Sequence, residues 1–447
     1  MNFVREILTS STLQKSLLSI AIIGIFLLSA FSVVTLSSSA TNPSPPFVPA
    51  YNLSNDQGNA QEPNVQSSGS NVYVSWTEAS KGIFFRASPD NGATWTPPLT
   101  STALKLSAKG GTTQYPLMAT FGSDVYVAWA QTSGTEDNLQ IFLATSTNYG
   151  VSFTPAIQVA PMPDTSELTP VVAVYGSTVY VAWSANGTSV VASSTNYGAN
   201  FNAPFTYSYA HEPQLAAYCS YGYAVADGGA LYVTSNNGST WRQIYISNCC
   251  GAEPWIQASG SNVVVAWETK SKTSTIYAAS SQNYGQTWTG AIELSSAQPD
   301  SWAPMLGLFG NTSVITWRTN PGGSLSQEYV SSSSNGGLTW SNVTAIGIAN
   351  RDNEWPFTVS ISGGSVYIMW SEKVQSSSSS SDWQTLIAYS SDNGSTWTSP
   401  VSLTSSAASG AHAEQDIATG SISSFGTAGF AAWQNNATTS QIYFASS

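Results

Sequence analysis

The stretch EPNVQSSGSNVYVSWTEASKGIFFRASPDNGATWTPPLT, residues 62–100, decides the fold of this chain. Apolar residues alternate with polar ones in three short runs, and glycine-containing turns separate the runs. Alternation with a period of two predicts β-strands rather than helices. The stretch therefore holds three strands, with Trp76 near the end of the second and an eight-residue motif after the third.

The same unit recurs along the chain with a period of about 40 to 60 residues, which is typical of four-stranded propeller blades. The second strand carries a tryptophan in seven copies, at Trp76, Trp129, Trp183, Trp267, Trp317, Trp370 and Trp433. About a dozen residues earlier, a proline is expected to open the innermost strand, at Pro63, Pro116, Pro170, Pro213, Pro254, Pro304 and Pro356. In the last copy, residues 415–417 take the place of the proline.

The motif after the third strand reads Ser-x-Asp-x-Gly-x-Thr-Trp at residues 88–95 and again at 390–397. Five further copies carry Asn in place of Asp, and two of these end in phenylalanine. The seven central residues are Asp90, Asn148, Asn196, Asn236, Asn283, Asn335 and Asp392. We expect this side chain to fold back onto turn amides, the glycine to supply a positive φ, and the aromatic residue to fill the blade core. The motif is therefore interpreted as structural.

Seven such motifs in register make residues 51–447 similar to the sialidase-like β-propellers built from Asp-box (BNR) repeats. The resemblance implies an all-β propeller. Eight opening strands predict eight blades, with seven as the alternative because the third and fourth copies are short. The last copy lacks an outer strand, and residues 51–54 match the outer strands of other copies. The N-terminal strand is therefore expected to close the ring by pairing with the C-terminal blade.

Composition excludes one class of function. The chain has 447 residues, of which 42% are hydrophobic and only 8% charged, with 12 Lys and Arg against 24 Asp and Glu. The apolar content is ample for a folded core. Nucleic-acid binders need clustered positive charge, which a formal charge of −12 does not provide.

The N-terminus predicts export. Residues 17–36 form an apolar run preceded by Arg5 and Lys15, and small residues follow at 38–40. Residues 1–40 therefore fit a cleaved signal peptide or a retained membrane anchor, and residues 41–50 a proline-rich linker. Both alternatives place the propeller outside the cell or on its surface, with the membrane reached only through this segment. Seven glycosylation sequons agree with export, at Asn52, Asn186, Asn237, Asn311, Asn342, Asn393 and Asn436.

Three cysteines are too few for a disulfide framework or a four-ligand zinc site. Cys249 and Cys250 are adjacent, and a bridge between them would make a stiff turn. The alternatives are a bond from Cys219 to either of them, or three free thiols.

One face of the propeller is expected to be acidic. In a four-stranded blade, the loops that enter the inner strand share a face with the loops between the second and third strands, opposite the Asp-box turns. These loops carry Glu62, Glu78, Glu136, Asp137, Asp164, Glu167, Glu212, Glu253, Glu268, Asp300, Asp352, Glu354, Glu372, Glu414 and Asp416. Glu precedes Pro at Glu62, Glu212 and Glu253, which predicts carboxylates around the channel mouth. They would suit Ca²⁺ or a cationic ligand, although a weakly charged protein also keeps its few acids in solvated loops.

Aromatic residues share these loops, at Tyr115, Trp302, Trp355 and Trp383. Exposed tryptophan beside carboxylates suits a glycan, and the alternative is packing across a blade seam. The predicted ligand-binding set is Glu62, Glu212, Glu253, Trp302, Arg318, Arg351 and Trp355. His211 and His412 also fall in these loops, as metal ligands or by chance.

The resemblance raises sialidase activity, which uses three arginines on the sugar carboxylate, a Tyr–Glu nucleophile and an Asp acid/base. This chain departs from that pattern: residues 41–447 hold four arginines, at Arg86, Arg242, Arg318 and Arg351, and no (F/Y)-R-x-P motif. Only the last two are expected on the acidic face. Another glycoside hydrolase would need a carboxylate pair, for which the candidates are Asp352 with Glu354 and Glu414 with Asp416.

The sequence therefore favours an exported propeller that binds a glycan, a cation or a cell-surface protein. The alternatives are a glycoside hydrolase of altered specificity and a purely structural envelope protein.

Overall fold

The structure, a computed structural model, describes residues 47–55, 58–108, 111–132, 139–160, 169–185, 187–208, 212–228, 230–247, 249–269, 271, 273–298, 300–319, 326–347, 353–374, 382–404, 420–436 and 440–447. Side chains are not described at 208, 353–357, 373–374, 382–383, 420 and 436. The signal or anchor segment, residues 1–40, lies outside this part of the chain. Within it, no helix is long and apolar enough to cross a membrane.

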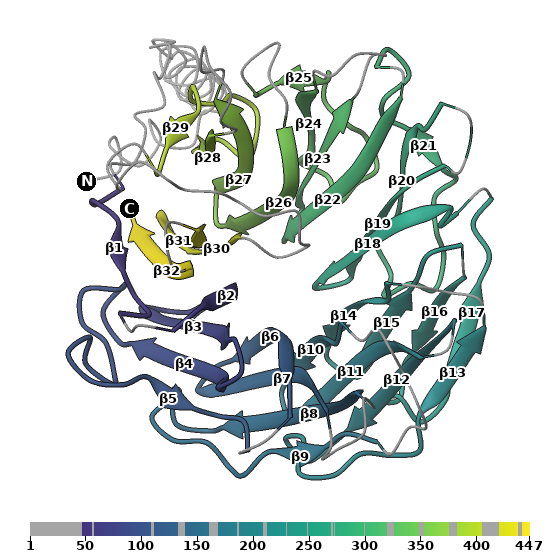
Figure 1. Ribbon diagram of the computed structural model, residues 1–447. Helices are drawn as coiled ribbons and strands as arrows, with labels where there is room; N and C mark the ends of the chain where they lie inside the picture. The colour runs from purple at the N-terminus through teal and green to yellow at the C-terminus, as the bar shows by residue number, and fades with distance from the viewer. Residues whose placement is uncertain are drawn as a thin grey trace, which may run out of the picture. The chain divides into compact units, whose positions relative to one another are not determined.

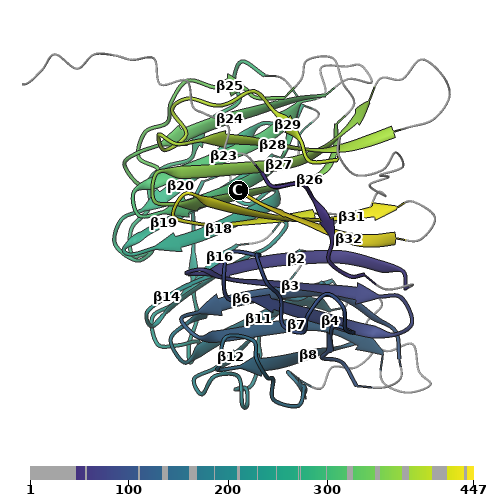
Figure 2. The ribbon, with the colours of Figure 1, turned by 90° about the vertical axis from the view of Figure 1, so that its left-hand side faces the viewer.

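Eight four-stranded antiparallel sheets form a ring, which is the arrangement of an eight-bladed β-propeller (Figure 1). Strand order follows the chain in blades 1 to 7, whereas in blade 8 the N-terminal strand β1 lies outside β32. The strands run between the two faces of the ring (Figure 2). The predicted fold class and the count of eight blades are confirmed.

The first four blades are blade 1, β2 (Ala60–Ser68), β3 (Asn71–Glu78), β4 (Gly82–Ser88) and β5 (Leu104–Lys105); blade 2, β6 (Thr113–Phe121), β7 (Asp124–Thr132), β8 (Leu139–Ser146) and β9 (Ile157–Gln158); blade 3, β10 (Val171–Tyr175), β11 (Thr178–Ala185), β12 (Thr188–Ser194) and β13 (Phe205–Ser208); and blade 4, β14 (Gln214–Tyr218), β15 (Tyr221–Val225), β16 (Leu231–Thr234) and β17 (Arg242–Ile244).

The last four are blade 5, β18 (Ala252–Ser259), β19 (Asn262–Glu268), β20 (Ile276–Ser281) and β21 (Ile292–Glu293); blade 6, β22 (Ser301–Phe309), β23 (Thr312–Thr319), β24 (Gln327–Ser333) and β25 (Thr344–Ala345); blade 7, β26 (Asn353–Ser362), β27 (Ser365–Val374), β28 (Asp382–Ser390) and β29 (Val401–Ser402); and blade 8, β30 (Gly420–Phe425), β31 (Ala428–Asn436), β32 (Ser440–Ser446) and β1 (Tyr51–Asn52).

The two ends of the propeller chain meet in blade 8, as predicted. Strand β1 is the outer strand there and pairs antiparallel with β32, with Tyr51 opposite Phe444 (Figure 1). The pairing continues past the strand, where the Leu53 amide donates to the Ile442 carbonyl over 2.7 Å. Strand β1 thereby covers the edge of β32, which would otherwise be open to pairing with another chain.

The tryptophans of the second strands form the deepest part of the blade cores. All seven are at most 1% exposed. The Asp-box aromatics differ, because Trp95 is buried whereas Trp241, Trp288, Trp340 and Trp397 are only half-buried. Trp95 packs edge-on against Phe444 of blade 8, with 5.0 Å between ring centroids. All five Asp-box tryptophans therefore pack on the blade cores as expected, Trp95 within the core and the other four at its edge.

The prolines were expected to open the inner strands, and this holds in blades 3 and 4, where β10 and β14 begin just after Pro170 and Pro213. In blades 1, 2, 5, 6 and 7 the strand begins earlier, and the proline lies in a β-bulge. A bulge leaves one residue unpaired, so it tolerates the missing proline N–H.

Seven hydrogen bonds fix the position of the Asp-box turns. In each of blades 1 to 7, an amide of the Asp-box donates to a carbonyl in the turn between the inner and second strands, as from Tyr149 to Ser123 over 2.8 Å. The two kinds of turn therefore share one face, here called the Asp-box face. The opposite face, where the chain enters the inner strands, is called the mouth face.

Candidate functional site

A cavity of about 350 Å³ lies where the eight inner strands surround the channel, and residues of all eight contribute to its wall. The wall is apolar along much of its length, through side chains such as Leu215, Met305 and Ile422. Its acidic members are Glu62, Glu212 and Glu253, the three Glu-Pro glutamates, contributed by blades 1, 4 and 5.

The backbone at these glutamates is strained in the same way. Glu62, Glu212 and Glu253 have φ of 54°, 50° and 45°, and Tyr115 and Ala303, which also precede prolines, have 55° each. Positive φ is uncommon outside glycine, and strained residues concentrate at functional sites. At Glu62, Tyr115, Glu253 and Ala303 the positive φ belongs to a repeated bulge, whereas Glu212 lies just before its strand begins.

A hydrogen bond across the blade seam holds each of four such bulges. The amide of the strained residue donates to a side-chain oxygen of the preceding blade: from Glu62 to Gln434 over 3.3 Å, from Tyr115 to Glu62 over 2.7 Å, from Glu253 to Asp227 over 2.6 Å, and from Ala303 to Glu268 over 3.0 Å. Three of these acceptors are carboxylates. Part of the acidic character of the mouth face therefore serves to join blades.

Glu62 illustrates this structural use. Its Oε2 atom accepts from the Thr77 hydroxyl of its own blade over 2.8 Å as well as from the Tyr115 amide of the next blade. These two hydrogen bonds fix the position of the Glu62 carboxyl, which lines the cavity.

Glu253 is in a different state. Its Oε2 atom is buried and has no hydrogen-bond partner among the described residues. Burial, followed by the nearby charges of Glu268, Glu212 and Asp227, raises the pKa of Glu253 from 4.5 to about 8, and Arg318 opposes this rise. At neutral pH Glu253 is therefore mostly a protonated acid within an otherwise negative cluster.

Arg318 provides the positive charge of this cluster. It is 4% exposed, and its Cζ lies 3.6 Å from the centroid of the Trp302 ring. The two residues are opposite each other in the pairing of β22 with β23. This cation–π contact occupies one face of a ring that was predicted to stack on a glycan or to pack across a seam. Trp302 is half-buried.

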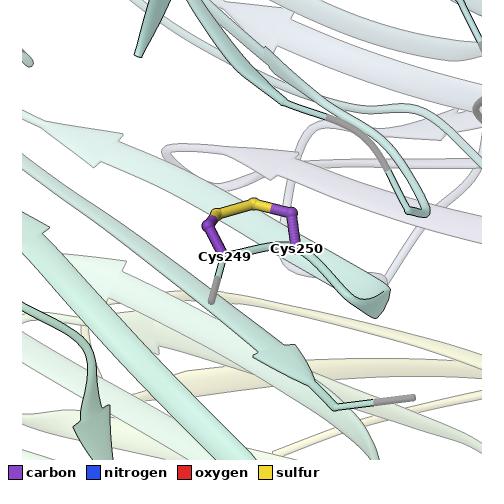
Figure 3. Close-up of a disulfide and its surroundings, with 2 residues drawn as sticks. All are labelled: Cys249 and Cys250. Atoms are coloured by element: carbon purple, nitrogen blue, oxygen red, sulfur yellow. A yellow bond between two sulfur atoms is a disulfide. The ribbon is translucent and has the colours of Figure 1, made fainter. Parts of the chain in front are cut away.

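A disulfide joins Cys249 and Cys250 just before β18 (Figure 3). Cys250 is fully buried against the core formed by blades 4 and 5, and Glu253 follows three residues later. The turn therefore positions the start of the strand that carries Glu253. Cys219 is free and exposed, on the Asp-box face.

Other predicted acids are not at the surface. Glu78 and Glu372 are fully buried rather than held in solvated loops. Glu78 accepts from the Trp76 indole over 3.1 Å and lies 3.7 Å from the Lys81 ammonium. Among the described residues, no three acidic, histidine or cysteine side chains are grouped so that they could hold a metal ion.

The described arginines do not converge. Arg86 is fully buried and donates to the carbonyls of Leu53, Pro97, Pro98 and Ser101, so it holds the loop before β5 and the closing strand. Arg242 is exposed on the Asp-box face, where it donates to the Gly285 carbonyl over 3.3 Å. Arg318 is thus the described arginine nearest the cavity.

Several predicted residues fall outside the described part of the chain. These are Glu136, Asp137, Asp164, Glu167, Asn186, His211, Arg351, Asp352, His412, Glu414 and Asp416, together with the side chains of Glu354, Trp355, Trp383 and Asn436. Trp255, which had no predicted role, lines the cavity next to Pro254. Its position two residues after a Glu-Pro glutamate is the signal that would have found it.

No protein-family model matches the chain, and no curated protein sequence matches it. Solved structures with a similar fold include an ulvan lyase of polysaccharide lyase family 25 (TM-score 0.47, 11% identity, 89% of this chain and 95% of that chain). Another is YCF48 bound to D1 peptide (TM-score 0.43, 12% identity, 90% and 94%). A Trypanosoma rangeli sialidase in complex with sialic acid aligns over 90% of this chain and 57% of its own, at TM-score 0.37 and 13% identity.

Proposed function

We propose that this chain is an exported, Asp-box-type binding propeller that holds an ammonium group of its ligand in the cavity at the mouth face. The observation that carries the proposal is the placement of Glu62, Glu212 and Glu253, from three blades, around one cavity. Carboxylates in a hollow with low-dielectric walls concentrate field lines and attract cations, and a cation bound beside Glu253 would lower its raised pKa, so that this carboxyl would ionise as well. The nearest positive charge, Arg318, lies against Trp302.

The remaining walls favour an organic cation. Trp255 and Tyr115 offer aromatic surface for a cation–π contact, and Asn64, Gln66 and Gln257 offer amide groups to hydroxyls. An amino sugar at the end of a glycan carries both an ammonium group and hydroxyls. We therefore propose amino-sugar oligosaccharides as the ligand class.

The test is a thermal melt of the purified chain with glucosamine oligosaccharides and, separately, with their N-acetylated forms. A ligand that binds the native state raises the melting temperature. The charged form should raise it and the uncharged form should not, and Glu212→Gln should abolish the rise while Glu293→Gln, outside the cavity, should not. Equal shifts with both sugars, or none with the charged one, would refute the proposal.

A second arm replaces the sugar with Ca²⁺ after treatment with EDTA. If Ca²⁺ raises the melting temperature and the amino sugar does not, the cavity is a metal site rather than an ammonium site.

A glycoside hydrolase is the second candidate, and the state of Glu253 favours it. A carboxyl group that keeps its proton at neutral pH can act as a general acid, and nearby Glu212 or Asp227 would then act as base. Release of reducing ends from a glycan panel would show this activity. It should disappear in Glu253→Gln, and activity that survives this change would exclude Glu253 as the acid.

A further inference from the structure

The Asp-box face carries an array of aromatic side chains that the repeat pattern did not predict. Phe121, Tyr175 and Tyr218 occupy the same position in three successive blades, at the end of the inner strand, and Tyr284 lies in the Asp-box turn of blade 5. They come from blades 2 to 5, which are neighbours in the ring (Figure 1).

The rings form one connected row. Centroids of Phe121 and Tyr175 lie 4.8 Å apart, those of Tyr175 and Tyr218 4.7 Å, and those of Tyr218 and Tyr284 6.4 Å. Tyr221 stacks on Tyr284 at 4.8 Å with 15° between ring planes. We call these five residues the aromatic row.

The row is ordered yet accessible to solvent. Phe121 is 38% exposed, and the four tyrosines are half-buried. Interaction with the Cys219 thiol and the Tyr218 hydroxyl, followed by burial, raises the pKa of Tyr175 to about 12. Ordered rings lose little conformational entropy when a ligand binds.

The surroundings of the row are almost without charge. The inner-to-second-strand turns and Asp-box turns of blades 2 to 5 contain one charged residue, Asp124, which is 9% exposed. The rest are Ser, Thr, Asn, Gln, Gly, Ala, Val, Cys and aromatic residues, at positions 121–124, 147–152, 175–178, 195–200, 218–221, 235–240, 259–262 and 282–287. One further charge lies beside these turns: Arg242, just after the Asp-box of blade 4, is exposed and donates to the Gly285 carbonyl. Tyr149 and Tyr197 add two further rings, 49% and 48% exposed.

We propose that the aromatic row is a binding surface for a neutral polysaccharide chain, separate from the cavity at the mouth face. Pyranose rings present apolar C–H faces that stack on aromatic rings and hydroxyls that bond to hydroxyl and amide groups. A surface with one exposed cation, Arg242, and one buried carboxylate, Asp124, offers little to an ionic polymer, so charge complementarity favours a neutral chain. The hot-spot aromatics of protein interfaces fill pockets, whereas these rings lie side by side, as a chain-like ligand requires.

The test is affinity electrophoresis of the purified full chain through gels that contain xylan, glucomannan or hydroxyethyl cellulose. We expect at least one of these neutral polymers to retard the wild type. The double variant Tyr175→Ala/Tyr218→Ala should weaken its affinity about tenfold or more, whereas Tyr175→Phe, which keeps the ring, should retain most of it.

The matched control is Phe309→Ala/Phe425→Ala. These two residues occupy the same turn position in blades 6 and 8, are 49% and 52% exposed, and lie outside the row. The control variant should bind the polymer like the wild type. All variants should keep the wild-type circular dichroism spectrum. A loss as large as that of the row variant would show that the row has no special role.

Two other outcomes would overturn the proposal. One is a wild type that none of the three neutral polymers retards. The other is a dimer in light scattering that the row variant converts to a monomer, which would make the surface a protein interface. Retardation by alginate, an anionic polymer, equal to that by the neutral polymers would also contradict the argument from charge.

Discussion

The two faces of the propeller are made by the same strands, yet they differ in regularity and in charge. The Asp-box face repeats one turn seven times and is nearly uncharged over blades 2 to 5. The mouth face carries strained bulges, carboxylates from different blades, a vicinal disulfide and the cavity. Regular hydrogen bonding fixes the first face, and side-chain chemistry that varies from blade to blade distinguishes the second.

The comparison also shows where a regular motif leaves room for variation. In each Asp-box, the residue before the invariant glycine has positive φ, from 55° at Asn237 to 69° at Gly336, and its backbone amide holds the turn. Its side chain differs between copies, being Asn, Tyr or Gly, and at Asn237 and Asn393 it accepts a hydrogen bond from a threonine of the preceding blade. Tyr149, Tyr197 and Tyr284 are three such residues.

The largest effect is expected where the Asp-box face meets the core. Gly92 has φ of 89°, and a Cβ there would lie 2.5 Å from the buried Phe444 ring. Gly92→Ala should therefore lower the free energy of unfolding by about 2–4 kcal/mol, measured by urea denaturation. Gly69→Ala is the control, because φ is 63° but nothing lies within 4 Å, so it should cost about 1 kcal/mol. Equal losses would mean that packing against Phe444 is unimportant.

On the mouth face, one substitution should stabilise the chain at alkaline pH. The carboxyl of Glu253 ionises near 4.5 when unfolded and near 8 when folded. Between these values the folded chain holds the extra proton, so the free energy of unfolding falls as pH rises and levels off above about 8. Glu253→Gln removes this fall, so it should be more stable than the wild type at pH 9 by about 2 kcal/mol. The same pH slope in both proteins would contradict this, and Glu293→Gln controls for loss of a carboxylate.

A smaller effect is expected from a single Asp-box side chain. Asp90 accepts from the amide and hydroxyl of Thr94 and from the Ser88 hydroxyl. Although burial raises the pKa of Asp90, these hydrogen bonds lower it below its usual value, so the stability they give is lost as pH falls through the folded-state pKa. Asp90→Ala should cost about 1–2 kcal/mol in thermal unfolding at neutral pH. Asp90→Asn should cost less, because Asn has this role in five other blades, and a larger cost would show that the charge matters.

The smallest effect is expected at Cys219, which is exposed and free on the Asp-box face. Cys219→Ser should change the free energy of unfolding by no more than about 0.5 kcal/mol, by the same urea measurement. A greater loss would show that the thiol contacts with Tyr175 contribute to stability as well as to the order of the aromatic row.

Much of the fold followed from the sequence because its signals are local. Alternating apolar residues, the Trp76-type strands and the seven Asp-boxes predicted the blade and its number, and residues 51–54 predicted the closure of the ring. The prolines were harder to interpret, because whether a proline begins a strand or lies in a bulge depends on pairing with the next strand, as at Pro63 and Pro213.

The sequence predicted less about the cavity at the mouth face than about the fold. The Glu-Pro repeats indicated the three glutamates that line the cavity, but their surroundings depend on how the blades pack. Glu62 accepts a hydrogen bond from the Tyr115 amide, whereas burial raises the pKa of Glu253. The same limit applies to Glu78 and Glu372, which are charged residues of loop-like sequence that are fully buried.

The sequence by itself determined the all-β repeat, the eight blades and the residues available at each turn, because strand periodicity and turn chemistry are written in neighbouring residues. Tertiary structure decided which of those residues meet. Packing of successive blades brings Glu212 and Glu253 to one cavity and places Phe121, Tyr175 and Tyr218 in one row. These residues lie tens of positions apart in the chain, so their burial, their pKa values and their contacts depend on the packing of one blade against the next.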